Sequence, residues 1–236
     1  MRIWRQLARQ RATGEGLKPE QWSEQMKRTQ CEWRPDDLES AEVGDVAYIC
    51  RKRRDAVVVI GHLLPDGNVI HAAGVILDFD GVIATAYHVV DKPDAVARCV
   101  MTADGVLYPI QEIIAANRPR DVALIRIKAN GLVAAPLSRG DDEGSSLTIL
   151  AHPAGEFYSV TQGQLRRYQA AVTYGTEVVQ MAVTADFTDG ASGGPVFNER
   201  GEVAGIVSFR RPATSGEVVK IASPAKMIRE LYEPTR

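Results

Sequence analysis

The sequence contains little cysteine. Its 236 residues include three, at positions far apart: Cys31, Cys50 and Cys99. An odd number of widely spaced cysteines excludes a disulfide framework, and no two of these cysteines have the spacing of metal ligands. We therefore expect free thiols and a protein that uses neither a metal nor an organic cofactor.

Long apolar runs are also absent, and neither sign of charge dominates. No segment approaches the roughly 18 apolar residues of a membrane span, and charges interrupt residues 1–11, where a signal peptide would be apolar. These absences predict a cytoplasmic protein that does not bind membranes. Lys and Arg number 28 against 30 for Asp and Glu, and the formal net charge of −2 gives no reason to expect nucleic acid as a partner.

Residues 1–40 differ from the rest of the chain. They are polar, rich in Arg, Gln and Glu, and they contain all three tryptophans, Trp4, Trp22 and Trp33. Residues 2–11 predict one short helix and the segment that opens at Pro19 another, because proline suits the first helical turn. We predict a helical N-terminal extension over residues 1–40 that packs on the main domain through its tryptophans. It is a candidate site for a regulatory partner or for homo-oligomer contacts; the alternative is that it only covers apolar surface.

From about residue 43 the pattern changes to short apolar runs separated by turn residues. The runs are residues 56–60, 74–77, 81–85, 122–127 and 147–150. Many short strands at this spacing predict an all-β domain over residues 41–236, a barrel or a sandwich. The polar stretch 137–144 divides it into halves of about 41–138 and 139–236, and Ser223 and Pro224 are suited to begin a closing C-terminal helix.

Three segments contain residues that together suit nucleophilic catalysis. In residues 189–197 glycines flank Ser192, which lets the backbone turn sharply and can bring the N–H groups of Gly190 and Ser192 into one small volume. The alternative is a glycine-rich turn with an incidental serine. His88 follows an apolar strand and small residues. Asp121 opens another apolar strand, where its carboxylate needs a hydrogen-bond donor such as an imidazole.

His88 and Asp121 also have structural alternatives, a histidine satisfied at a strand end and an aspartate at the surface. His62, His71 and His152 lack a comparable context, and we expect them to be structural. The order His, Asp, Ser along the chain is that of the chymotrypsin-type catalytic triad. This order favours the catalytic interpretation over three separate structural ones.

Residues 85–90 read TAYHVV and residues 121–125 read DVALI. Together with the glycine-flanked serine, these segments resemble those of trypsin-like serine peptidases, most closely the HtrA/Deg-like branch and the bacterial glutamyl endopeptidases. Residues 151–155, 160–163 and 201–208 follow in the family's order, so the resemblance extends over residues 56–231. It implies an all-β, chymotrypsin-like double six-stranded β-barrel with the active site in the cleft between the barrels.

The resemblance also implies residue roles. His88, Asp121 and Ser192 would form the catalytic triad, and the backbone N–H groups of Gly190 and Ser192 the oxyanion hole. The chain would be a serine endopeptidase that hydrolyses protein or peptide substrates through an acyl-enzyme. That its N-terminal helices regulate it is a separate hypothesis. The alternative is a catalytically silent trypsin-fold binding or scaffold module. Retention of all three side chains favours the enzyme.

Some positions depart from the family pattern. Ala191 stands where trypsins have aspartate and HtrA-like proteins usually have asparagine, and Tyr87 replaces the usual alanine before the histidine. We also expect no PDZ domain.

The positions that match the family's primary substrate pocket are Asp186, Ser208 and Arg210. Asp186 would either select Lys or Arg at the cleaved bond or be only a loop carboxylate. Arg210 would narrow the pocket, pair with Asp186, or receive an acidic side chain.

Overall fold

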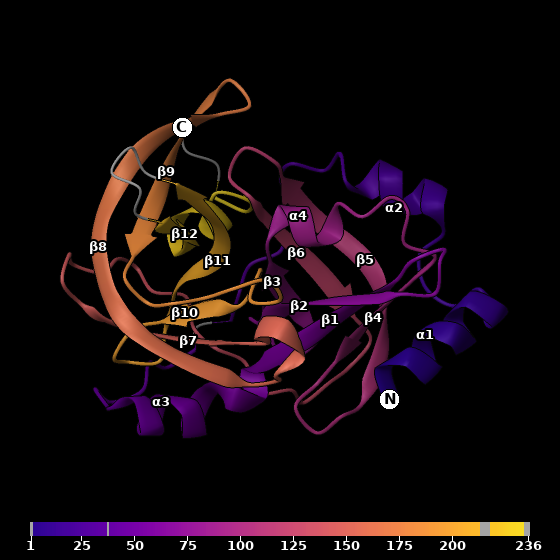
Figure 1. Ribbon diagram of the computed structural model, residues 1–236, viewed down its shortest axis with the longest axis horizontal. Helices are drawn as coiled ribbons and strands as arrows, with labels where there is room; N and C mark the ends of the chain where they lie inside the picture. Colours follow the sequence, from indigo (N-terminus) through magenta and orange to yellow (C-terminus); the bar gives the residue numbers. More distant parts are fainter. Residues whose placement is uncertain (1, 37, 213–217, 234–236) are drawn as a thin grey trace.

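Two closed barrels of antiparallel strands form the body of the protein (Figure 1). The structure is a computed structural model that describes residues 2–36, 38–212 and 218–233. The first barrel contains, in spatial order, β1 (Val57–Leu63), β2 (Val69–Ile76), β3 (Val82–Thr85), β6 (Val122–Ile127), β5 (Leu107–Asn117) and β4 (Ala97–Met101). The second contains β10 (Pro195–Phe197), β11 (Val203–Pro212), β12 (Val218–Pro224), β9 (Thr176–Val183), β8 (Ser159–Thr173) and β7 (Ser146–Ala151). This arrangement confirms the predicted double six-stranded barrel.

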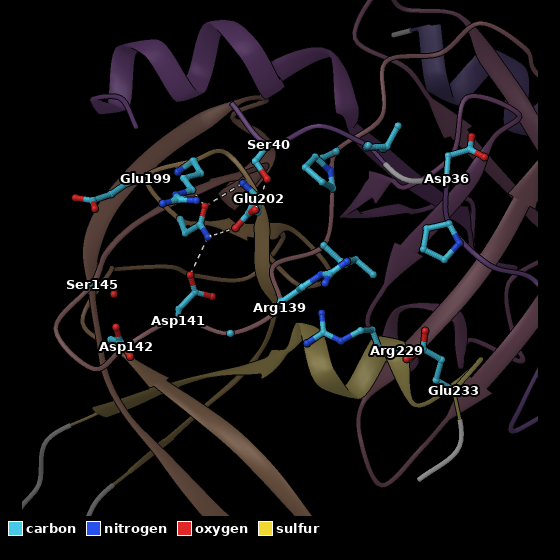
Figure 2. Close-up of a pocket in the computed structure, with 18 of the residues that line it drawn as sticks. Asp36, Ser40, Arg139, Asp141, Asp142, Ser145, Glu199, Glu202, Arg229 and Glu233 are labelled. Atoms are coloured by element: carbon cyan, nitrogen blue, oxygen red, sulfur yellow. Dashed lines mark hydrogen bonds between the residues drawn. The ribbon is translucent and has the colours of Figure 1, made fainter. Parts of the chain in front are cut away.

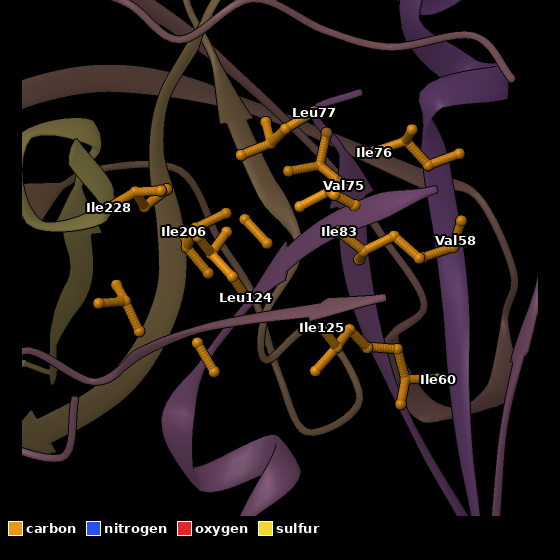
Figure 3. Close-up of a cluster of buried hydrophobic side chains, with 14 of the residues drawn as sticks. Val58, Ile60, Val75, Ile76, Leu77, Ile83, Leu124, Ile125, Ile206 and Ile228 are labelled. Atoms are coloured by element: carbon orange, nitrogen blue, oxygen red, sulfur yellow. The ribbon is translucent and has the colours of Figure 1, made fainter. Parts of the chain in front are cut away.

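The main core fills the first barrel and continues into the second. Figure 3 shows valine and isoleucine side chains of β1, β2, β3 and β6 packed together, with Ile206 of β11 and Ile228 of the C-terminal helix against them. β-branched side chains suit such a pleated, buried surface, and every residue of β1 is buried. A separate buried cluster fills the second barrel. The two barrels are therefore joined by apolar packing and not by a linker alone.

Two helices lie in the N-terminal extension, α1 (Arg2–Thr13) and α2 (Pro19–Gln25), as the sequence predicts. Trp22 is buried and donates its indole N–H to the carbonyl of Val90 at 3.1 Å, and Trp33 donates to Asp78 Oδ2 at 3.0 Å. Trp4 is 53% exposed. Two of the three tryptophans therefore attach the extension to the first barrel. The division of the chain at residue 40 stays a prediction.

The described residues between α2 and residue 46, which are 26–36 and 38–45, run without helix along both barrels. Their backbone bonds first to β5, where the Ala116 N–H donates to Arg28 O at 2.7 Å, and then to the C-terminal end, where the Cys31 N–H donates to Leu231 O at 2.8 Å. Farther along, the Ala41 N–H donates to Arg200 O in the second barrel at 3.0 Å. The segment thus connects the two barrels along one side of the molecule.

The helix that follows the N-terminal extension was not predicted. Residues 46–53, expected within the β region, form α3 (Val46–Arg53) beside β7. The side chain of Asp45 caps it by accepting from the Tyr48 N–H at 2.8 Å, and three basic residues in its last turn suit the helix dipole. The apolar run 46–50 resembles a strand, but these end effects decide the conformation.

The closing helix α5 (Ala225–Arg229) begins where the sequence predicts it, with a different cap. Pro224 occupies the N-cap position, and the Ser223 hydroxyl donates instead to Arg120 O at 2.8 Å. The three cysteines are free thiols, as expected. Among the residues that the structure describes, no helix is long and apolar enough to cross a membrane.

Two buried histidines make the stability of this fold depend on pH. His62 and His152 are almost completely buried, and burial, more than the nearby positive charges, lowers their pKa values to about 3 and about 4. An unfolded histidine titrates near 6.5, so below that pH the unfolded chain binds more protons than the folded one. We expect the free energy of unfolding to fall from about pH 6.5 to 5, by about 1.4 kcal/mol per pH unit for each histidine.

Urea unfolding followed by circular dichroism across this pH range measures the slope. His62→Leu is the matched variant, because neither ring nitrogen of His62 has a hydrogen-bond partner within the described part of the chain. It should reduce the slope by about half. A stability that does not change between pH 6.5 and 5 in the unsubstituted protein would contradict the burial of neutral imidazoles.

Candidate active site

His88 lies on a single helical turn, α4 (Tyr87–Val90), that follows the fully buried strand β3. Its Nδ1 lies 3.0 Å from each carboxylate oxygen of Asp121, and its backbone N–H donates to Asp121 Oδ1 at 3.0 Å. The carboxylate can only accept, so Nδ1 carries the proton and Nε2 has a free lone pair. In this tautomer Nε2 can accept a hydrogen bond, and the His88 side chain is 42% exposed.

Asp121 stands immediately before β6 in a left-handed backbone conformation with φ of 50°. This conformation is uncommon for a residue other than glycine, and it persists only where neighbouring contacts impose it. Besides His88, the carboxylate accepts a hydrogen bond from the hydroxyl of Ser208, a buried residue on β11. Asp121 therefore accepts hydrogen bonds from both barrels, from His88 of the first and Ser208 of the second.

Ser192 lies in a tight turn between β9 and β10 that contacts both barrels. Its carbonyl accepts from the Ala73 N–H of β2 at 2.9 Å, and the Gly193 N–H donates to Val207 O of β11 at 2.8 Å. A Cβ on Gly193 would overlap the hydroxyl oxygen of Thr85, three residues before His88, so only glycine fits there. The turn is thus pressed against the end of the strand that leads to His88.

The structure brings His88 and Asp121 into direct contact and places Ser192 at the same junction. In the described part of the chain, the Ser192 hydroxyl makes no hydrogen bond to the His88 imidazole. Catalytic hydrogen bonds of this kind are often long until substrate binds. Asp121 and the Ser192 turn therefore both lie where the two barrels meet.

The two N–H groups proposed for the oxyanion hole are unoccupied donors. Gly190 has φ of +93°, and a Cβ there would lie 2.5 Å from His152 O, which explains the glycine. No hydrogen bond within the described residues uses the N–H of Gly190 or of Ser192. Both remain available to an oxygen of a bound molecule.

The expected pocket residues pair with other side chains. Asp186 forms an ion pair with Lys220 at 2.5 Å, and this hydrogen bond lowers the pKa of the Asp186 carboxyl. Arg210 pairs with Asp189 at 2.8 Å and not with Asp186, which was one of its expected alternatives. A carboxylate already neutralised by a lysine is poorly suited to select a basic substrate side chain. The pocket roles of Asp186, Ser208 and Arg210 stay predictions.

Sequence reasoning missed three contacts at this site. Ser208, expected along the pocket, bonds to Asp121. A bulge between Val207 and Phe209 interrupts the alternation of side chains along the strand, so the sequence pattern does not predict the direction of Ser208. His71 and His152, expected to be structural, both border Gly190. No pattern local to either histidine indicates this position, since strand β2, which carries His71, and the turn that carries His152 are far apart in the chain.

A cavity of about 1220 Å³ lies away from this site (Figure 2). It is lined by the extended N-terminal segment, the connection between the barrels and the C-terminal helix, and His88, Asp121 and Ser192 are not among its lining residues. Both signs of charge are present, and Asn198 donates to Asp141 at 2.8 Å and to Glu202 at 2.7 Å. These polar groups satisfy one another, so the cavity wall is a structural network.

Comparisons with solved structures support the fold. A variant of the HtrA-type protease AlgW with a tripeptide superposes with a TM-score of 0.68 at 21% identity, covering 81% of this chain and 64% of the other. A serine endoprotease from Yersinia pestis gives a TM-score of 0.67 at 22% identity, covering 82% and 68%. At these identities the likeness concerns the fold alone.

Curated relatives match the same region. A probable periplasmic DegP-like serine endoprotease from Halomonas elongata is 32% identical over 140 residues, and one from Marinomonas is 28% identical over 164 residues. The anti-sigma-I factor RsgI9 from Acetivibrio thermocellus is 28% identical over 133 residues. The matches cover 58%, 68% and 55% of this chain but only 28%, 34% and 18% of the relatives. The chain thus spans about a third or less of their length.

The cytoplasmic location expected from the sequence is contradicted by these relatives, because the DegP-like proteins are named as periplasmic. That expectation depended on the charges in residues 1–11. Of these, residues 2–11 belong to helix α1, which packs against the first barrel. Their composition therefore reflects folding and gives no information on export.

The family model of the trypsin-like peptidase domain matches residues 72–206, which contain the strands that position His88, Asp121 and Ser192. Because this match covers more than half of the chain, the chain belongs to the trypsin-like peptidase domain family.

Proposed function

We propose that this protein is a serine endopeptidase that cleaves peptide bonds through an acyl-enzyme on Ser192. The observation that carries the proposal is the Asp121 carboxylate, which holds His88 Nδ1 at 3.0 Å at the point where the Ser192 turn contacts the first barrel. The curated relatives named as serine endoproteases support it across the same region.

Each residue has a defined role in the proposed reaction. His88 Nε2 takes the hydroxyl proton as Ser192 attacks the substrate carbonyl, and Asp121 stabilises the imidazolium that forms. The N–H groups of Gly190 and Ser192 bind the oxyanion. When the tetrahedral intermediate collapses, the C–N bond breaks and His88 gives its proton to the leaving amine. Water then gives a proton to His88 as it attacks the acyl-enzyme, the ester bond to Ser192 breaks, and His88 returns the proton to the Ser192 oxygen as the acid leaves.

A second candidate is a silent trypsin-fold binding module. Two observations support a binding module. Ser192 makes no hydrogen bond to His88 within the described residues, and one relative is named as an anti-sigma factor. The enzyme and the module differ in one respect that can be measured, the nucleophilicity of Ser192.

Labelling with a fluorophosphonate probe measures this directly. We expect the unsubstituted protein to be labelled and to hydrolyse casein, and Ser192→Ala to lose labelling and activity by a factor on the order of 10⁶ while remaining folded. Ser159→Ala is the matched control, because it removes a serine hydroxyl that, within the described ranges, bonds to Glu156 O alone. A folded, unsubstituted protein that resists labelling would support the binding module instead.

We also propose that the N-terminal extension supports catalysis by holding helix α4. The Trp22 indole N–H bonds to Val90 O at the end of α4, and the Arg98 guanidinium lies 4.1 Å over the Trp22 ring. Arg98 in turn donates to Lys92 O at 2.6 Å, just after α4. α2 is therefore connected twice to the turn that positions His88. A regulatory partner or a homo-oligomer contact through residues 1–40 stays a prediction.

The matched pair Trp22→Phe and Trp33→Phe tests this support. Each variant removes one indole N–H donor and keeps an aromatic ring, but Trp33 bonds to Asp78, away from α4. We expect Trp22→Phe to lower kcat by about 3- to 10-fold, because a small displacement of His88 impairs proton transfer. Trp33→Phe should leave kcat unchanged. Equal rates in both variants and the unsubstituted protein would exclude a positioning role for α2.

A further inference from the structure

A short turn of the second barrel lies directly against the proposed oxyanion hole. It comprises residues 152–155, between β7 and β8, and includes the 3-10 turn Pro153–Gly155. The Ala154 N–H donates to Asp189 O at 2.9 Å, and the His152 carbonyl lies 2.5 Å from the position that a Cβ on Gly190 would occupy. The turn therefore contacts the Asp189–Gly190 peptide on one side.

This contact fixes the direction of a proposed oxyanion donor. The carbonyl of Asp189 and the N–H of Gly190 belong to one planar, trans peptide group, so they point in opposite directions. Because Ala154 binds the Asp189 oxygen on the side of the turn, the Gly190 N–H must point away from it. Rotation of this peptide would break the Ala154 bond and remove the donor from the site.

The turn needs external support to hold this position. Ala154 adopts φ of 49°, a left-handed conformation that costs energy for an alanine. His152 supplies one attachment: its Nδ1 accepts from the Tyr158 N–H at 3.0 Å, which leaves Nε2 to donate to Val58 O of β1 at 3.1 Å. Burial lowers the pKa of His152 to about 4, so this neutral tautomer persists at neutral pH.

His71 supplies the second attachment from the first barrel. This residue lies on β2, with Nε2 3.2 Å from the carbonyl oxygen of His152. The same nitrogen is 3.3 Å from the ideal Cβ position of Gly190, and the ring makes an edge contact with Phe157 at a centroid distance of 5.6 Å. Since a carbonyl can only accept, Nε2 donates. His71 thus occupies the space between β2, the 152–155 turn and Gly190.

We propose that His71 is a positioning residue for the oxyanion hole: its Nε2–H bond to His152 O holds the 152–155 turn against the Asp189–Gly190 peptide and keeps the Gly190 N–H directed into the site. The inference rests on the proposed endopeptidase function. It assigns a role in the reaction to a histidine outside the triad that does not itself touch the reacting atoms. The competing interpretation is that the imidazole only fills space beneath Phe157.

Two substitutions separate these interpretations. His71→Leu introduces an apolar side chain of similar bulk and removes the N–H donor. His71→Gln keeps an N–H donor on a flexible side chain. Loss of an oxyanion donor lowers kcat by about 10²- to 10³-fold; a loosened donor should cost less. We expect His71→Leu to lower kcat on a fluorogenic peptide by about 10-fold with KM changed less than about twofold, and His71→Gln to recover most of the rate.

A second readout depends on the oxyanion alone. A peptide aldehyde forms a tetrahedral adduct with Ser192 that uses the oxyanion hole, so its inhibition constant should rise in His71→Leu by about the same factor as kcat falls. The corresponding peptide alcohol, which has no carbonyl and forms no adduct with Ser192, should bind equally well to both proteins. If His71 only fills space, His71→Leu should change the binding of both ligands by the same factor.

Ser159→Ala is the control, because it removes a side-chain bond to Glu156 O at the far end of the same loop. It should leave kcat and aldehyde binding unchanged. Unaltered kcat in folded His71→Leu would overturn this inference alone, as would a His71→Gln variant as slow as His71→Leu with raised KM. An unsubstituted protein that neither cleaves nor labels would overturn the proposed function, and this inference with it.

Discussion

The Asp121 carboxylate is the point on which the site depends. It accepts from the His88 backbone, the His88 imidazole and the Ser208 hydroxyl, and so satisfies a partly buried negative charge with donors from both barrels. A buried carboxylate without such donors is costly, and charge-assisted hydrogen bonds are the strong ones. The left-handed backbone of Asp121 adds a local cost that these bonds offset. Docking of the barrels and orientation of the imidazole are therefore achieved by the same contacts.

Other contacts across the interface also fix how the two barrels dock. Ile206 and Ile228 extend the core of the first barrel into the second half of the chain (Figure 3). The backbone of the Ser192 turn bonds to Ala73 on one side and Val207 on the other. The extended segment after α2 then bonds to both barrels in succession. Apolar packing thus brings the barrels together, and directional hydrogen bonds set their relative position.

The sequence was informative wherever a pattern is local. Runs such as residues 122–127 encode strands by their β-branched residues, and glycines around Ser192 encode a turn that a Cβ would prevent. Predictions failed where long-range or end effects decide the outcome. Helix α3 depends on the Asp45 cap, and the direction of Ser208 depends on a bulge in β11. Arg210 and Asp186 each had several charged neighbours, and only the folded hairpins determine that they pair with Asp189 and Lys220.

The interface between the barrels contacts both the proposed acid–base pair and the proposed oxyanion donor. The acid–base pair is fixed where Ser208 of the second barrel bonds to Asp121 of the first. The Asp189–Gly190 peptide is fixed where the 152–155 turn of the second barrel meets Val58 and His71 of the first. A shift of one barrel against the other would therefore disturb the Asp121–Ser208 bond and the contacts of the proposed oxyanion donor together. The docking of the barrels therefore supports both the proposed acid–base pair and the proposed oxyanion donor, although neither set of contacts includes the Ser192 hydroxyl.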